Sequence, residues 1–310
     1  MGVFVYLPLV LPLTALPVAR LAEQHLHPRR AAGLLTTVAV ILASCSLVCL
    51  GLLVVVGTAQ LPGNPLPDGW SDAEVRDAVP HDAFAGKASI LALVAVTVAC
   101  GVTVHRHYRF RARAHRTLAG LPGGDVAVLP DDVPYAYALP GSPGRVMVST
   151  ALLASLEPAE RRALFAHERA HLAGRHHRLL LATRLAGCVN PLLWPLLGAL
   201  VYSTERWADE EAARVTGDRR LTARAVGKAA LVSRPVPGGA AFAAFAAVGP
   251  VPRRVAALLG PVPPDRGWPP ALTPAGVAAL VAAAGTTVSA LSALNAAVAL
   301  FLVLEAATPL

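Results

Sequence analysis

Two long uncharged stretches constrain the fold of this chain more than any other feature of its sequence. Residues 31–61 and 274–304 contain no Asp, Glu, Lys or Arg and are rich in Ala, Val and Leu. About 20 apolar residues are enough to cross the hydrocarbon core of a bilayer as a helix. Residues 3–19 and 88–104 have the same character over a shorter length, although three prolines interrupt the first of them. The sequence therefore predicts a mainly α, polytopic membrane protein with about four transmembrane helices.

The composition agrees with this prediction. Hydrophobic residues make up 55% of the chain and charged residues 15%, and the mean hydropathy is +0.55, which is too apolar for an ordinary soluble domain. No basic residue precedes the first apolar stretch and no clear cleavage site follows it, so we expect no cleaved signal peptide. The cysteines all lie in apolar stretches, which predicts neither disulfides nor a cysteine zinc site: Cys45, Cys49, Cys100 and Cys188.

The charges between these stretches predict the orientation of the chain. Arg20, Arg29 and Arg30 lie between the first two stretches, and five arginines lie between positions 106 and 116, after the third. The segment between the second and third stretches, residues 62–87, carries five acidic residues. Positive charge is retained in the cytoplasm, so we expect the amino terminus and the acidic loop outside and residues 105–270 inside. The net charge of +8 then reflects arginines that meet anionic lipid headgroups, and we expect no nucleic-acid partner.

The sequence His167-Glu168-Arg169-Ala170-His171 carries the most specific chemical signal. Its two histidines are four residues apart, on one face of a helix, where both can bind one zinc ion. Glu168 then lies beside the open coordination position, where it can act as general base. The alternative is a charged, solvated helix face. Apolar residues flank the motif on both sides, however, and buried His and Glu side chains need partners.

Glu205 is the third ligand that we expect. Asp209 follows it one helical turn later, and its carboxylate can accept the free ring N–H of a ligand histidine and fix the tautomer of that ring. The alternative for both residues is an ordinary acidic first turn of a helix, continued by Glu210 and Glu211.

His177 is a second candidate for the third ligand. Together with Gly174 it completes the longer H-E-x-x-H-x-x-G-x-x-H pattern of the metzincins, in which a third histidine binds zinc. That pattern also requires a methionine turn below the metal, but Met1 and Met147 both precede the motif, and the chain has no other methionine. We therefore expect Glu205 rather than His177 to complete the site.

An uncharged stretch at residues 185–204 lies between His171 and Glu205. Its length suits a transmembrane span, but a single crossing would put the two halves of the zinc site on opposite sides of the membrane. The dipeptides Asn190-Pro191 and Trp194-Pro195 also interrupt it. We therefore expect a bent helical hairpin that dips into the membrane interface or packs against the other spans. The alternative is that Glu205 is not a ligand.

Short strands are predicted before the zinc helix, at residues 125–129, 135–139 and 145–149, because Pro and Gly separate β-prone runs there. A free strand edge near the metal could bind an extended peptide by strand addition. We therefore predict a small α+β zincin-like metallopeptidase domain between the third and last spans. The expected boundaries are 1–104 for three amino-terminal spans, 105–270 for the catalytic domain and 271–310 for the closing span.

In this arrangement the chain resembles the BlaR/MecR type of membrane zinc metallopeptidases, with HtpX and the CAAX-prenyl endopeptidases as related gluzincins. The resemblance covers most of the chain, and its specific part, residues 145–218, contains the H-E-R-A-H motif and the later E-R-W-A-D sequence. It implies that His167, His171 and Glu205 bind zinc and that Glu168 is the catalytic base. The best-known members carry a penicillin-binding sensor domain after the last span. We expect none here, and no β-lactam sensing.

The predicted function is hydrolysis of peptide bonds in a protein substrate, with one zinc ion per chain. We expect a substrate in the cytoplasm or close to the membrane, and the resemblance suggests a transcriptional repressor. The alternatives are an HtpX-like quality-control protease, a zinc-binding membrane sensor or scaffold without catalysis, and a transporter with the histidines along an ion path. Tyr202, His176 and Arg206 are equal candidates for stabilising the oxyanion.

Overall fold

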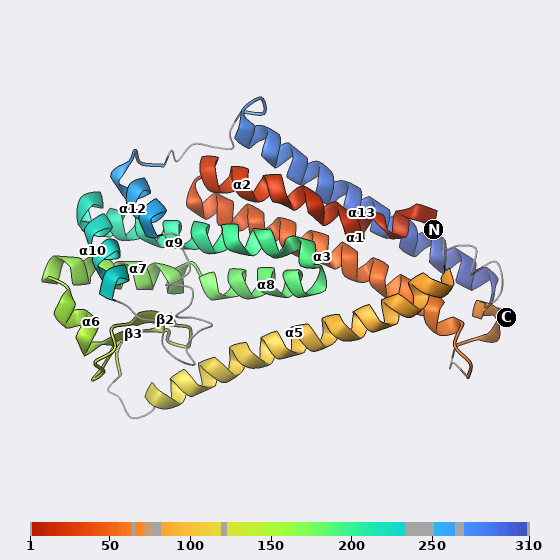
Figure 1. Ribbon diagram of the computed structural model, residues 1–310, viewed down its shortest axis with the longest axis horizontal. Helices are drawn as coiled ribbons and strands as arrows, with labels where there is room; N and C mark the ends of the chain where they lie inside the picture. The colour runs from red at the N-terminus through yellow and green to blue at the C-terminus, as the bar shows by residue number, and fades with distance from the viewer. Residues whose placement is uncertain are drawn as a thin grey trace.

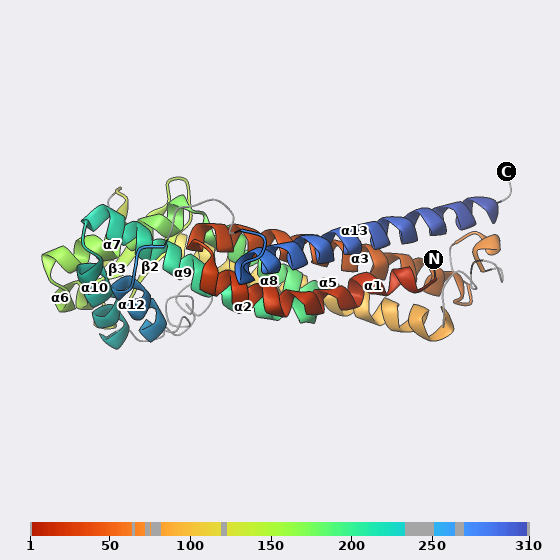
Figure 2. The ribbon, with the colours of Figure 1, turned by 90° about the horizontal axis from the view of Figure 1, so that it is seen from above.

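The computed structural model describes residues 2–63, 66–71, 75, 82–118, 123–232, 251–263 and 270–308. Three of the five acidic residues predicted in the loop at 62–87 lie outside the described residues. Long helices form an elongated bundle, with a three-stranded sheet and further helices at one end (Figure 1). Among the described residues, three helices are long and apolar enough to cross a membrane: α3 (Pro28–Ala59), α5 (Asp82–Leu118) and α13 (Pro274–Ala306). α3 packs against both of the others. Figure 2 shows α13 alongside α3, whereas α5 is close to α3 at the end far from the sheet and diverges from it toward the sheet (Figure 1).

The span predicted at residues 3–19 is not among these three helices. Prolines break this segment because they have no N–H for a helical hydrogen bond. Pro12 cannot donate to the carbonyl of Pro8, and Ser46 Oγ of α3 donates to that carbonyl instead, at 2.7 Å. The described chain therefore contains three candidate spans, and the expected number of four is not confirmed. The pieces are η1 (Gly2–Val5), α1 (Leu7–Val10), η2 (Leu11–Thr14) and α2 (Ala15–His25).

The apolar stretch at 185–204 forms part of a helical hairpin, made of α8 (His176–Val189), η4 (Pro191–Leu193) and α9 (Trp194–Thr216). The two long helices pack against each other and against α3. Asn190, at the turn, donates from Nδ2 to the Leu9 carbonyl and to Ser46 Oγ, both at 3.0 Å. The turn therefore lies inside the bundle, and α9 returns the chain to the end at which α8 began (Figure 1).

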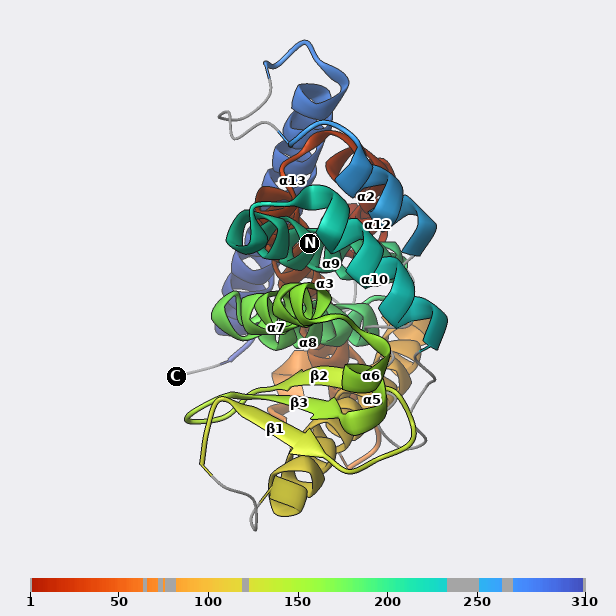
Figure 3. The same ribbon diagram turned by 90° about the vertical axis from the view of Figure 1, so that its left-hand side faces the viewer.

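The sheet contains β1 (Val126–Leu129), β2 (Ala136–Leu139) and β3 (Arg145–Ser149), in the order β1-β3-β2. β3 pairs antiparallel with β2 and parallel with β1. The strands begin within one residue of the positions predicted for them. Figure 3 shows that β2 is the strand nearest to α7 (Pro158–Ala173), which packs against it.

Helix α7 is fixed at its first turn and along its apolar face. Glu160 Oε2 accepts the backbone N–H of Glu157 at 2.9 Å and pairs with Lys228 Nζ of α10 (Arg219–Val232) at the same distance. Val148 and Leu164 meet in the core between the sheet and α7. These contacts set the direction in which the H-E-x-x-H face points. The other elements of the described residues are η3 (Asp68–Ser71), α6 (Thr150–Ser155) and α12 (Val251–Leu259).

Candidate metal centre

Helices α7 and α9 bring together the three residues that the sequence predicts as ligands. His167 Nε2 and His171 Nε2 lie 3.1 Å apart, because residues four positions apart share one face of a helix. The Glu205 carboxylate faces both rings: Oε2 lies 3.5 Å from His167 Nε2, and Oε1 lies 3.5 Å from His171 Nε2. The ligand atoms of the three residues all lie within 4.8 Å of one another.

This donor set fits a zinc ion. Catalytic zinc is bound by three protein ligands drawn from His, Glu and similar residues, and a fourth position is left for water or substrate. Two imidazole nitrogens and one carboxylate converge here, and Glu205 is only 3% exposed. Lone pairs that converge in a buried place are stabilised by a cation between them.

Asp209 orients the first motif histidine. Its Oδ1 lies 3.1 Å from His167 Nδ1, so His167 is left with Nε2 for a metal. Burial disfavours a charge on His167, but Asp209 and Glu205 outweigh burial and raise the pKa of His167 to about 10. Since a metal ligand must give up its proton, zinc binding would release a proton from this ring.

Glu168 is buried between α7 and β2. Burial raises the pKa of the Glu168 carboxyl to about 7, and a hydrogen bond from the backbone of Ala138 partly opposes this rise. A cavity of about 50 Å³ lies beside the carboxyl, lined by both motif histidines and by residues 136–138 of β2. A carboxylate at this position can take a proton from a water molecule held next to the ligands.

His176 supports the second motif histidine. The Nδ1 atoms of His171 and His176 lie 2.7 Å apart, and the His176 ring packs against Trp207 with their centroids 4.5 Å apart. Burial lowers the pKa of His176 to about 2, so its ring is neutral. It can therefore accept the Nδ1 proton of His171, which leaves His171 Nε2 for a metal.

The other residues singled out by the sequence lie further from the ligands. His177 lines the same cavity but is not part of the metal-binding group found among the described residues. Tyr202 and Arg206 line a separate cavity, between α2 and α12. Of the three candidates for stabilising an oxyanion, His176 is the one that borders the ligands.

Arg254 of α12, which is 4% exposed, is a site residue that was not predicted from the sequence. Its Nη1 lies 2.8 Å from Glu205 Oε2, and its Nε and Nη2 donate to the two carboxylate oxygens of Asp209 at 2.8 and 2.7 Å. The sequence around α12 is rich in proline and resembles a linker, so Arg254 was not expected to be a site residue. The available signal was an arginine on the apolar face of an amphipathic segment, next to Val255 and Leu258.

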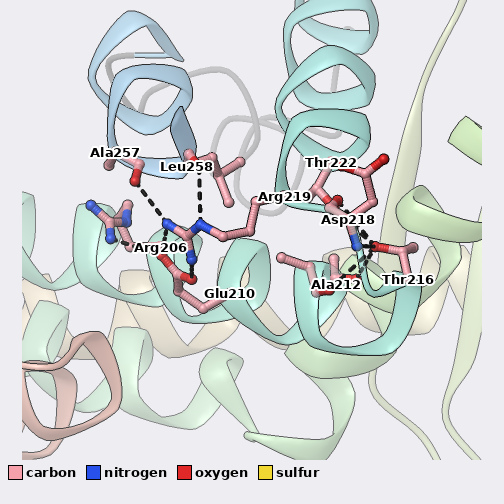
Figure 4. Close-up of polar contacts among 10 residues, drawn as sticks. Arg206, Glu210, Ala212, Thr216, Asp218, Arg219, Thr222, Ala257 and Leu258 are labelled. Carbon is pink, nitrogen blue, oxygen red and sulfur yellow. Dashed lines mark hydrogen bonds and ion pairs between the residues drawn. The ribbon is translucent and has the colours of Figure 1, made fainter. Parts of the chain in front are cut away.

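A second group of charges attaches α12 to its neighbours (Figure 4). Arg219 of α10 donates to the carbonyls of Ala257 and Leu258 at 2.9 and 3.0 Å. The same guanidinium pairs with Glu210 of α9, which Arg206 also contacts at 2.9 Å. The free carbonyls at the end of α12 are thereby capped, and the helix is held over the metal-binding group.

Residues 105–190 match peptidase family M48, a zinc metallopeptidase family that includes HtpX and the CAAX protease. The match runs from the end of α5 through the sheet and α7 into α8, and it ends before Glu205. Comparison with curated proteins and with solved structures gave no match. The family match over this part of the chain and the three candidate spans support a membrane metallopeptidase, and the convergent residues are the ones that could hold its metal. They do not single out the BlaR/MecR type.

Proposed function

We propose that this protein is a membrane-embedded zinc endopeptidase that cleaves proteins in the cytoplasm or at the membrane surface. One observation carries the proposal: Glu168 lies between the convergent ligands His167, His171 and Glu205 and the strand β2. The metal ligands, the base and a strand able to hold a peptide are therefore next to one another, as peptide hydrolysis requires.

The free edge of β2 offers backbone groups to an extended peptide. The N–H of Ser149 donates to the Tyr135 carbonyl, and in antiparallel pairs the hydrogen-bonded positions alternate. Tyr137 therefore pairs with β3, while Ala136 and Ala138 direct their N–H and C=O groups away from it. The N–H of Ala138 already donates to Glu168, so the N–H of Ala136 and the carbonyls of both alanines are the groups offered to a peptide. Both alanines line the cavity beside Glu168. A substrate that adds as a strand here would bring its backbone next to the base and the ligands.

The side chains of the site divide the chemistry among them. Zinc, when bound by His167, His171 and Glu205, supplies a Lewis acid that activates water and polarises the scissile carbonyl. Glu168 accepts the proton of the attacking water and passes it to the leaving amine. Asp209 and His176 hold the two ligand rings at their Nδ1 atoms, so that both Nε2 atoms face one point.

Replacing Ala136 by Pro is expected to weaken substrate binding. Proline removes one N–H from the free edge of β2 without removing a hydrogen bond to β3, and sheet edges tolerate proline. One lost hydrogen bond costs about 0.5–1.5 kcal/mol, which is a rise in KM of about two- to twelve-fold. The matched control is Val128→Pro, which removes an N–H from the free edge of β1 on the far side of the sheet and should leave KM unchanged. Equal KM values in the two variants would contradict strand addition at β2.

We place residues 105–270 on the cytoplasmic side, with the hairpin of α8 and α9 dipping into the membrane. The five arginines between positions 106 and 116, at the end of α5, favour this side. The contact of Asn190 with Ser46, well inside the candidate span α3, favours the dip. The metal-binding group then lies at the membrane surface, at the base of the hairpin.

A reporter fused after Gly123 is expected to show a cytoplasmic location, and one fused after Asp72 an external location. An alkaline phosphatase fusion, active only outside, and a fluorescent protein fusion, bright only inside, would measure this at both sites. The two reporters control each other. An active phosphatase at Gly123 would overturn the proposed orientation.

Two proposals for the substrate class can be distinguished by experiment. A transcriptional repressor is suggested by the BlaR/MecR resemblance, whereas the match to peptidase family M48 favours HtpX-like quality control of membrane proteins. Quantitative proteomics of cells with the wild-type protein or Glu168→Gln distinguishes them. Accumulation of one DNA-binding protein supports the first proposal, and accumulation of many membrane proteins supports the second.

A further inference from the structure

We propose that Arg254 is a positioning residue of the zinc site, which holds the ligand Glu205 and the supporting carboxylate Asp209 in a fixed relation through one guanidinium group. This inference rests on the proposed function, because it assigns Arg254 to the same metal site. Arg254 follows Asp209 by 45 positions in the chain. Its role makes α12 a part of the metal site rather than a linker to the last span.

The geometry of the contacts uses all three guanidinium nitrogens. Nε and Nη2 bind the two oxygens of Asp209 side by side, at 2.8 and 2.7 Å, which is the paired arrangement that Arg forms with carboxylates. Nη1 remains free to reach Glu205 Oε2 at 2.8 Å. Asp209 in turn contacts His167 Nδ1 at 3.1 Å. Arg254 therefore sets the position of one ligand directly and of a second ligand through Asp209.

The burial of these groups makes the contact costly to lose. The side chains of Arg254, Glu205 and Asp209 are 5%, 3% and 0% exposed. Removing one partner from a buried ion pair leaves an uncompensated charge, which is strongly destabilising. The charges also balance when a divalent ion is present, since that ion and the guanidinium together offset the carboxylates of Glu205, Asp209 and Glu168. Arg254 thus fits the metal-loaded site and does not simply replace the metal.

Lysine cannot take the place of Arg254. An ammonium group is a point charge on a flexible chain, whereas the planar guanidinium presents donors in a fixed fork. One ammonium could pair with Asp209 or with Glu205, but it could not fix both carboxylates in this geometry. Arg254→Lys therefore keeps the buried positive charge and removes the alignment.

Helix α12 should stay docked in such a variant. Arg219 caps its end through the carbonyls of Ala257 and Leu258, and Leu258 is buried in a core with Ala213 and Ala223. A change in metal binding in Arg254→Lys can therefore be assigned to the lost fork rather than to a detached helix.

The test is the zinc affinity of the full-length protein in detergent, measured by competition with a chelator. Arg254→Lys is expected to bind zinc roughly 10–100-fold more weakly than the wild type, as expected for the loss of a group that supports metal ligands. The visible absorption spectrum of the cobalt-substituted protein should change too, because it reports ligand geometry. Arg253→Lys is the matched control, since Arg253 is half exposed and pairs with Glu23 of α2, away from the site. It should keep wild-type affinity and spectrum.

A wild-type zinc affinity and cobalt spectrum in Arg254→Lys would overturn the inference. A melting temperature equal to that of Arg253→Lys shows that the variant is folded. If Arg254→Lys melts at a lower temperature, the chelator competition and the cobalt spectrum are recorded at a temperature at which both variants are folded, with the same expected loss. Proteolysis is assayed separately. Wild-type protein that binds zinc but cleaves nothing would contradict the proposed function alone, while active, normally loaded Arg254→Lys would contradict this inference alone.

Discussion

Glu168→Gln is expected to bind zinc normally and to lose nearly all proteolytic activity. Glu168 is not among the three residues whose ligand atoms converge, so replacing it with an amide of the same shape should leave the metal in place. The amide cannot accept a proton from water. Losing a general base typically lowers the rate by about 10²–10⁴-fold. Zinc content by elemental analysis and cleavage of a substrate protein, measured on the same preparation, check both parts.

Glu211→Gln is the matched control for this prediction. It makes the same chemical change on α9, where Glu211 forms an exposed ion pair with Arg214, and such pairs contribute little to stability. Its activity should equal that of the wild type. If Glu168→Gln still cleaves the substrate at the control's rate, Glu168 is not the base. If neither the wild type nor the control cleaves any protein whose level depends on this gene, the zinc-binding scaffold is favoured over a protease.

The parts of the site that could be predicted from sequence are the residue pairs that lie on a single helix. His167 and His171 are one helical turn apart, so their common face follows from helix geometry alone. The step from Glu205 to Asp209 is of the same kind. The two pairs can meet only if residues 185–204 form a hairpin. The helix breaks at Asn190 and Trp194 indicated such a hairpin.

The parts that could not be predicted depend on contacts between distant segments. Arg254 meets Asp209 across 45 positions, and no local pattern connects them. The strands were placed correctly because Pro and Gly separate them, but their order was not predicted. The order β1-β3-β2 arises because the chain passes from β1 to the far edge of the sheet, forms β2 there, and returns between the two as β3. Hydropathy also counted residues 3–19 as a span, because it measures composition and does not register how prolines divide a helix.

Glu205→Gln is expected to lose most of its bound zinc. The Glu205 carboxylate faces both motif histidines at 3.5 Å, and glutamine keeps its shape but removes its negative charge. The loss of affinity should exceed the roughly 10–100-fold that follows when only a supporting group is changed. Asp209→Asn should show that smaller loss, and its activity should recover when zinc is added. Zinc retained after dialysis, together with a chelator competition, measures the whole series.

His177→Ala separates the two possible ligand sets, and it should keep its zinc. In the metzincin pattern a glycine turns the chain so that the third histidine meets the metal. Here Gly174 has an ordinary helical conformation, with φ −75, and the turn is made by Arg175 in the left-handed region, with φ 50. That turn presents His176, not His177, to His171, at 2.7 Å. For His177 to bind the metal, α8 would have to rotate and remove His176 from its contact with Trp207. Zinc lost in His177→Ala and kept in Glu205→Gln would show that α8 does rotate, and that the metzincin-like ligand set is the right one.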